Sequence, residues 1–233
     1  MDAQFADTLI GLMAAWLLLA GVALWSHREG LGLARPMLLA SVRAPLQLLA
    51  LALVLHWIFD IEAHWLQALL ILGFCILAGH NSASHFEHQH RAWLASSVGL
   101  ACGCAVTLPW LAFAGAIDNS TRALVPLGSM VAANGMNAVS IMFERMKSGN
   151  TVGEGLRTAM IPNVDTLRVV GLVHMPGIFV GMVLAGSPAL LAASAQLTIL
   201  YMIVASSFTA CMVSFLMLSH WQKKESPGGQ ACG

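Results

Sequence analysis

The chain has 233 residues, of which 58% are hydrophobic and only 9% are charged. A soluble domain is about a quarter charged, so this composition excludes a soluble enzyme and a disordered chain. Lys+Arg and Asp+Glu both number 11, which leaves no excess of basic side chains for nucleic acid. A membrane span takes about 20 apolar residues, so the chain has room for about seven spans with short connections. We therefore expect an integral membrane protein that contacts the lipid bilayer.

Apolar runs and polar connections alternate along the chain. Asp2 and Asp7 precede the first run, where a cleavable signal peptide would carry Lys or Arg, so this run is expected to remain as a span. The runs predict an all-α, polytopic fold with one transmembrane domain over residues 1–220 and a disordered cytoplasmic tail at 221–233. The seven predicted spans cover residues 8–26, 37–59, 64–80, 93–117, 123–143, 164–185 and 191–219.

The charge of the connections predicts the orientation of the spans. The connections at residues 27–35, 80–91 and 144–157 are basic, as is the tail, and those at 60–62 and 118–121 are more acidic. Basic connections stay in the cytoplasm. We therefore expect the N-terminus outside and the C-terminus in the cytoplasm.

The second predicted span carries two polar side chains, Arg43 and Gln47. Their spacing of four residues places them on one face of a helix. An ionisable side chain inside a span is costly and suggests a functional site. This face either lines a water-filled cavity or contacts other protein, unless Arg43 simply extends to the headgroups from near the cytoplasmic end.

The fifth predicted span carries Asn134 and Asn137 among small residues and Met. Small residues let helices approach closely, and asparagine side chains can hydrogen-bond between them. This segment is either a packing seam or part of a transport route, and a seam beside a route combines the two.

Pro162 precedes the sixth predicted span. Because proline does not fit deep inside a regular helix, it predicts a break between a short surface helix and the span. Asn163 would then cap the new helix, with Asp165 in its first turn. Asp165 and Arg168 are three residues apart and can pair, so they are either a structural ion pair or part of the pathway.

A second break is predicted at Pro176 and Gly177. A broken helix leaves carbonyl groups unpaired, which is tolerated where they line a cavity. His174 and Met175 precede this break, and both are ligand types for soft metals. The alternative is a histidine that packs through hydrogen bonds.

The connection after the third span is rich in histidine. His85 and His88 would share one face of a helix and could bind a divalent metal, although their spacing matches no defined site. A solvated loop is the alternative. The sequence has no P-loop, no H-E-x-x-H and no G-x-S-x-G motif. We therefore expect no enzyme and no covalently bound cofactor, and any ATP hydrolysis would need a separate subunit.

Three stretches give the chain a family resemblance over about residues 8–220. These stretches are Ser41 to Gln47, Val125 to Met136, and Arg157 to Gly177 with Gly181, Ala185, Gly186, Pro188 and Gln196 beyond. The most specific pattern is Ile-Pro-x-x-Asp followed by Val-Gly-Leu-x-x-x-Pro-Gly. In these stretches the sequence resembles the FetB-type permeases, the membrane subunits of iron-export ABC transporters, a family that includes a plant half-transporter involved in aluminium tolerance.

The resemblance implies a seven-helix permease of the bacterial inner membrane that forms a homodimer. A cytosolic ATP-binding subunit would power export of iron or a related metal cation, so ATP would bind only to that partner. The resemblance also implies that six matched positions are important, without assigning them a known role. They are Arg43, Gln47, Asn134, Asp165, Arg168 and Pro176.

The sequence departs from the family pattern in two places. Family members carry a longer connection between the fifth and sixth spans, with a Leu-Gly-Ala helix that looks like the docking element for the ATPase, whereas residues 146–155 are short and Gly-rich. His174 and Met175 stand where relatives usually have Ser-Leu. The short connection keeps open an ATPase-independent channel or secondary transporter. The histidine-rich connection keeps open an accessory sensor.

Overall fold

The computed structural model describes residues 2–58, 64–86, 89–117 and 120–225. These residues form eight α-helices and no strand. Six of the described helices are long and apolar enough to cross a membrane, which confirms the all-α, polytopic fold. The candidate spans are Leu9–Arg28, Ala34–Val54, Trp65–Ala83, Gln89–Phe113, Ala123–Lys147 and Ala189–Trp221.

The chain divides into two compact units, Met1–Ile61 and Glu62–Gly233. The first unit contains α1 (Asp2–Arg28) and α2 (Ala34–Ile58), which contact each other. Between them, the Trp16 Nε1–H donates to Ser41 Oγ at 3.2 Å. Most large apolar side chains of this unit are exposed, as expected for helices that face lipid or other protein.

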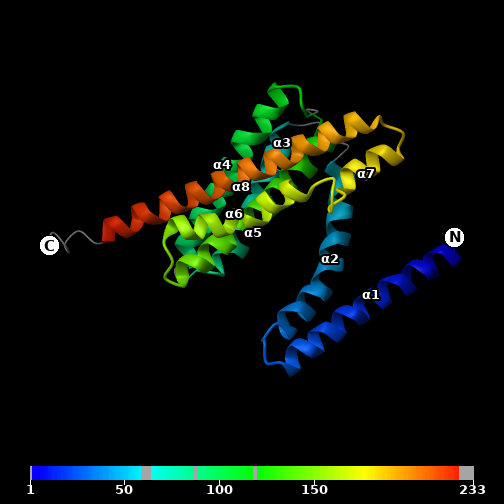
Figure 1. The fold of residues 1–233 in the computed structure, drawn as a ribbon, viewed down its shortest axis with the longest axis horizontal. Helices are drawn as coiled ribbons and strands as arrows, with labels where there is room; N and C mark the ends of the chain where they lie inside the picture. Colours follow the sequence, from blue (N-terminus) through cyan, green and yellow to red (C-terminus); the bar gives the residue numbers. More distant parts are fainter. Residues whose placement is uncertain (1, 59–63, 87–88, 118–119, 226–233) are drawn as a thin grey trace. The chain divides into compact units, whose positions relative to one another are not determined.

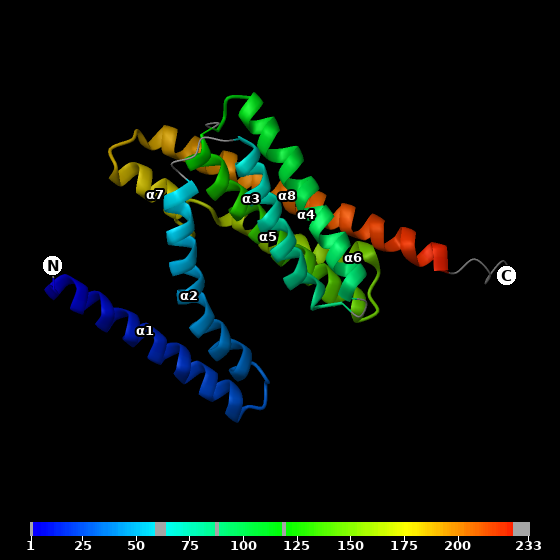
Figure 2. The same cartoon turned by 180° about the vertical axis from the view of Figure 1, so that it is seen from behind.

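The second unit is a bundle in which α4 packs against both α3 and α8, and α5 contacts all three. Its core contains Leu100, Val139, Met142 and Phe143, all fully buried. The views in Figures 1 and 2 show α8 (orange to red) running along this bundle. The helices are α3 (His64–Ala83), α4 (Gln89–Phe113), α5 (Thr121–Lys147), α6 (Val152–Val169), α7 (Gly177–Leu184) and α8 (Ala189–Glu225).

Small residues allow α4 and α8 to approach closely. A Cβ atom at Gly99 would lie 2.5 Å from the Ala210 carbonyl oxygen, and one at Gly103 would lie 2.8 Å from that of Ser206. Ser214 Oγ donates to the carbonyl oxygens of Ala210, at 2.7 Å, and Ala95, at 3.2 Å. The two helices are therefore in backbone contact, the arrangement that small residues permit in membrane proteins.

The predicted span at 164–185 starts at the wrong residue, because α6 begins at Val152, but it is broken before Gly177 as predicted. It is divided between the end of α6, an irregular segment at residues 170–176, and α7. Figure 1 shows that α6 and α7 follow one another along the bundle, from the end of α5 to the start of α8. They return the chain between α5 and α8 as a discontinuous element, which explains why only six described helices qualify as spans.

The predicted break at Pro162 is also wrong, because Pro162 lies inside α6. The helix begins earlier, where Thr151 and Glu154 form a capping box, so Asn163 is not the cap and Asp165 lies in the second half of the helix. Proline removes only one backbone donor, so α6 lacks one hydrogen bond at Pro162 and remains helical beyond it. The helix instead ends before Gly171, whose φ of +82° favours glycine.

The connection between α5 and α6 is shorter than the sequence indicates. Helix α5 continues to Lys147 and α6 starts at Val152, which leaves four residues between them. The predicted disordered tail also starts inside a helix, since α8 extends to Glu225; residues 226–233 lie outside the described residues.

Candidate functional site

A pocket lies where α5, α6, α7 and α8 meet, with a volume of about 540 Å³. Its lining is mostly apolar, with a small number of polar side chains and no Asp, Glu, Lys or Arg, and we refer to it as the break pocket. The residues that line it are Met130, Asn134, Asn163, Thr166, His174, Pro176, Gly177, Ile178, Gln196, Ile199, Leu200, Ile203 and Val204.

The break between α6 and α7 places three residues at this pocket. After Val169 the chain turns tightly, and the N–H of Gly171 donates to the His174 carbonyl oxygen at 3.0 Å. Pro176 then adopts an extended conformation as the N-cap residue of α7. His174, Pro176 and Gly177 therefore reach the break pocket. Because α7 begins at Gly177 with Pro176 as its N-cap, the predicted break at these two residues is confirmed.

Two polar side chains of the break pocket each donate a hydrogen bond within their own helix. Asn134 Nδ2 donates to the Met130 carbonyl oxygen at 2.9 Å. Thr166 Oγ1 donates to the Pro162 carbonyl oxygen at 2.8 Å. The remaining capacity of the Thr166 hydroxyl is to accept, whereas the Asn134 amide can accept through its oxygen and donate through its second N–H.

Gln196 provides a further acceptor at the break pocket. The residue is only 7% exposed, and its Oε1 is buried without a hydrogen-bond partner among the described residues. A buried polar atom without a partner costs about 1–3 kcal/mol. Such an atom at the wall of a pocket indicates a place where a ligand or water supplies the missing donor.

The break pocket includes some of the predicted pathway residues and leaves others out. Asn134 and His174 line it, but Asn137 and Met175 are exposed and are not part of the lining. Asn137 is three positions from Asn134 on the same helix, so the two side chains differ in direction by about 60° around the helix axis. Only Asn134 reaches this pocket.

Asp165 and Arg168 form the predicted ion pair, with Arg168 Nη1 and Asp165 Oδ1 3.1 Å apart. Both side chains are exposed and outside the pocket lining, where Asn163 and Thr166 stand instead. An exposed pair at this spacing stabilises a helix by about 0.3–0.5 kcal/mol. Their role in a pathway stays a prediction.

Arg43 and Gln47 lie on α2, in the first unit, and are both exposed within that unit. Pro45 lies between them inside the helix. Their predicted role also stays a prediction.

The sequence reasoning gave no role to Gln196 and missed Thr166, and it assigned Asn163 to a cap. A signal for Gln196 is present, because it is the only Asn or Gln between Ala189 and Trp221 in a strongly apolar run. No local signal marks Asn163 and Thr166, because their place at the pocket depends on where α6 ends.

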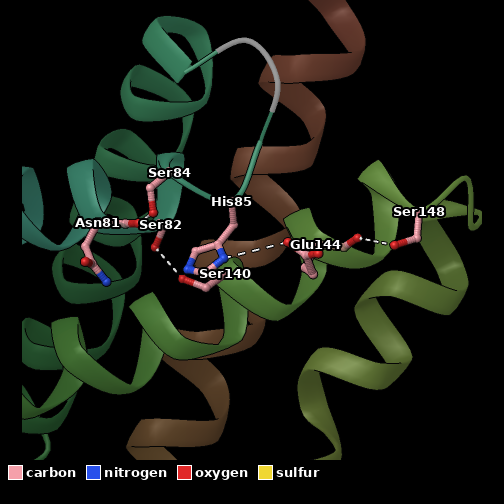
Figure 3. Close-up of polar contacts among 7 residues, drawn as sticks. All are labelled: Asn81, Ser82, Ser84, His85, Ser140, Glu144 and Ser148. Carbon is pink, nitrogen blue, oxygen red and sulfur yellow. Dashed lines mark hydrogen bonds and ion pairs between the residues drawn. The ribbon is translucent and has the colours of Figure 1, made fainter. Parts of the chain in front are cut away.

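The histidine-rich connection contributes to a second polar cluster, shown in Figure 3. His85 Nδ1 lies 3.7 Å from Glu144 Oε2, on α5, with both side chains about half exposed. Beside them, Ser140 Oγ donates to Ser82 Oγ at 3.2 Å. His88 lies outside the described residues, so the predicted pairing of His85 with His88 remains a prediction.

The described residues contain no group of three or more His, Cys, Asp or Glu side chains that could hold a metal ion. A closed structural metal site of the kind that needs four such ligands is therefore not formed by this part of the chain. The break pocket offers amide, hydroxyl and imidazole groups instead.

The start of α6 has its own electrostatic feature. The Thr151 N–H and hydroxyl both donate to Glu154 Oε2 at 2.9 Å, and these hydrogen bonds lower the pKa of that carboxyl below its ordinary value. The negative charge also lies in the first turn, where the helix dipole favours it. This fixes the entry into α6 and hence the register of Thr166 at the pocket.

Long apolar helices together with a discontinuous helix beside a polar pocket are features of membrane transport proteins. The chain belongs to the uncharacterised protein family UPF0014, whose sequence profile matches residues 9–152 and 148–221. The two matched segments overlap at residues 148–152, at the connection between α5 and α6.

Named relatives cover most of the chain. It is 27% identical to the "Probable iron export permease protein FetB" of Escherichia coli (strain K12), over 88% of this chain and 89% of the relative. It is 24% identical to the "UPF0014 membrane protein STAR2" of Oryza sativa subsp. japonica, over 89% and 82%. It is 22% identical to the "Protein ALUMINUM SENSITIVE 3" of Arabidopsis thaliana, over 90% and 85%. No solved structure matches the chain significantly.

The family and the six apolar helices define a multi-pass permease of the bacterial cell membrane. This confirms the resemblance to the FetB-type permeases and the predicted membrane location.

Proposed function

We propose that this chain is the membrane permease subunit of an ATP-driven transporter that exports iron or a related metal cation. The observation that carries the proposal is the break between Val169 and Gly177, which opens a pocket with polar groups inside a bundle of apolar helices. Irregular backbone at membrane depth is tolerated where it lines a cavity, and discontinuous helices form the substrate sites of many transporters.

The relatives support the metal as substrate. One is named as an iron export permease and another for sensitivity to aluminium. In the proposal the metal cation is the cargo and no resident cofactor is needed. ATP is bound and hydrolysed by a separate cytosolic subunit, since the chain has no P-loop.

The ATPase docks at the cytoplasmic end of the α5–α6 hairpin. Arg145 and Lys147 in the last turn of α5 make this end basic, and basic segments stay in the cytoplasm. In this proposal the N-terminus lies outside and the C-terminus inside, in agreement with the orientation predicted from the alternation of charge. Two copies of the chain form the complete permease.

The experiment is a gentle purification of the tagged chain from its native membrane, followed by identification of bound proteins and an ATPase assay. The proposal predicts that an ATP-binding subunit co-purifies and that iron or a related metal changes its rate of hydrolysis. Purification without any ATPase, under conditions that hold comparable transporters together, contradicts the ATP-driven proposal.

A second candidate is a metal channel or secondary transporter that needs no ATPase. It is favoured by the four-residue connection between α5 and α6, which leaves no separate docking helix. Metal flux through the purified chain in liposomes without nucleotide distinguishes the two. Flux at an undiminished rate without ATP supports the second candidate, and flux that requires the ATPase and ATP supports the first.

A further inference from the structure

We propose that the break pocket binds its metal cation as a hydrated ion, through acceptor groups that contact the ion's water molecules, with Gln196 as the principal acceptor. This inference rests on the proposed function and specifies how the cargo is recognised.

The polar wall of the break pocket offers several acceptors. Thr166 donates its only hydroxyl proton to Pro162, and Asn134 uses one of its two N–H groups on Met130, so both side chains can still accept through oxygen. The Oε1 of Gln196 is buried and has no donor among the described residues. The last side-chain torsion of glutamine has a broad distribution of values, so Oε1 can rotate toward the pocket. The partner that Gln196 Oε1 lacks is a donor.

A hydrated divalent metal ion supplies many strong donors, because the ion polarises the O–H bonds of its bound waters. Six waters occupy about 180 Å³ at about 30 Å³ each. The break pocket, at about 540 Å³, has room for this ion.

Direct coordination of a bare ion fits the break pocket poorly. No carboxylate or thiolate is among its lining residues, so removal of the ion's water would not be compensated by opposite charge. The first N–H groups of α7, at Gly177 and Ile178, lie at the same pocket and carry partial positive charge. They disfavour a bare cation at this wall.

Weak, water-mediated binding also suits transport. A site on a pathway must attract the ion enough for entry and release it again. A pocket of neutral acceptors meets both conditions, whereas a cluster of carboxylates would hold the ion tightly.

The test measures binding of Mn²⁺ to the purified full chain, from the loss of the free Mn²⁺ signal in electron paramagnetic resonance. The competitor is cobalt(III) hexammine, a complex of similar size to a hydrated ion that does not exchange its ligands. We expect the complex to displace Mn²⁺ from the wild-type chain. We expect Gln196→Leu to weaken Mn²⁺ binding about tenfold, which is the effect of losing one hydrogen bond to a charged ligand.

The controls separate the pocket from the rest of the molecule. Gln196→Glu keeps an acceptor and is expected to retain binding, which excludes misfolding as the cause of the loss. Thr166→Val should weaken binding several-fold. Thr198→Val removes an equivalent hydroxyl on α8, one that donates to the Ser194 carbonyl oxygen outside the pocket, and should have no effect.

Mn²⁺ binding that resists cobalt(III) hexammine overturns the inference, and so does binding that is unchanged in Gln196→Leu. The absence of Mn²⁺ binding to the wild-type chain also overturns it. The proposed function is tested separately. Its test is whether an ATPase co-purifies with the chain and whether metal changes the rate of ATP hydrolysis.

Discussion

Two helix pairs of the second unit differ in the continuity of their backbone: α4 with α8, and α6 with α7. Helices α4 and α8 are continuous and lie in contact through glycine and serine, with Gly103 close to the Ser206 carbonyl oxygen. Helices α6 and α7 are separated at residues 170–176, and each is too short or too polar to qualify as a span. The first pair is a scaffold, and the second places polar groups at a pocket.

The difference shows which local features decide whether a membrane protein packs or opens a polar site. A continuous apolar helix satisfies its own hydrogen bonds and can use small residues for close packing. A helix that ends inside the bundle leaves backbone and side-chain groups to be satisfied by something else. In this chain Gly171 and Pro176 delimit that second region.

The largest effect is expected at the scaffold. Gly99→Ala places a methyl group 2.5 Å from the Ala210 carbonyl oxygen, and forced overpacking of this kind costs about 1–3 kcal/mol. We expect a clear fall in the Tm of the protein in detergent. Gly73→Ala on α3 is the matched control, because a Cβ there meets nothing within 4 Å. Equal Tm values for the two variants would contradict the close contact of α4 and α8.

A smaller loss is expected at the break. Gly171 has a φ of +82°, and an alanine there costs about 1–2 kcal/mol because its Cβ crowds the backbone. Gly171→Ala should lower the Tm, whereas Gly181→Ala on α7, where φ is not positive and a Cβ meets nothing within 4 Å, should not. A Gly171→Ala variant as stable as wild type would show that the break does not depend on this glycine.

The exposed ion pair should contribute little to stability. Asp165→Asn removes the charge opposite Arg168, and such pairs are worth about 0.3–0.5 kcal/mol. We expect almost no change in Tm. Metal flux measured on the same variant then tests the predicted pathway role, which a wild-type rate would contradict.

A small effect that depends on pH is expected at the start of α6. Hydrogen bonds from Thr151 lower the pKa of Glu154 in the folded chain, so its stabilising contribution is present above the pKa of the unfolded chain. It is lost as the pH falls through the lowered pKa. Glu154→Gln should therefore lower the Tm slightly at pH 7, and its difference from wild type should shrink in acid. A difference independent of pH would contradict the capping role of the charge.

The sequence predicted the apolar helices well and the sixth span poorly. Long apolar runs such as residues 191–219 have one plausible structure in a membrane, so length and composition suffice. The segment from Glu154 to Leu184 mixes charges, two prolines and several glycines, and local signals there compete. Pro162 favoured an early break, but the capping box at Thr151 starts the helix before it and Gly171 ends it later.

The candidate site was predicted in part for a related reason. His174, Pro176 and Gly177 stand out locally as ligand and helix-breaking types, and Asn134 stands out as an amide in a span. Gln196 reaches the same pocket only because α8 packs beside the break, which is a contact between residues distant in sequence.

The central claim, that the break pocket lies on the path of the cation, is tested most directly by blocking it. His174→Cys in a cysteine-free background would be labelled with a positively charged, membrane-impermeant thiol reagent, and metal flux measured before and after. Val173→Cys is the control, because Val173 is 82% exposed and does not line the pocket. At equal labelling, measured by mass, we predict that flux stops in His174→Cys and continues in Val173→Cys. Unchanged flux through fully labelled His174→Cys would contradict the account.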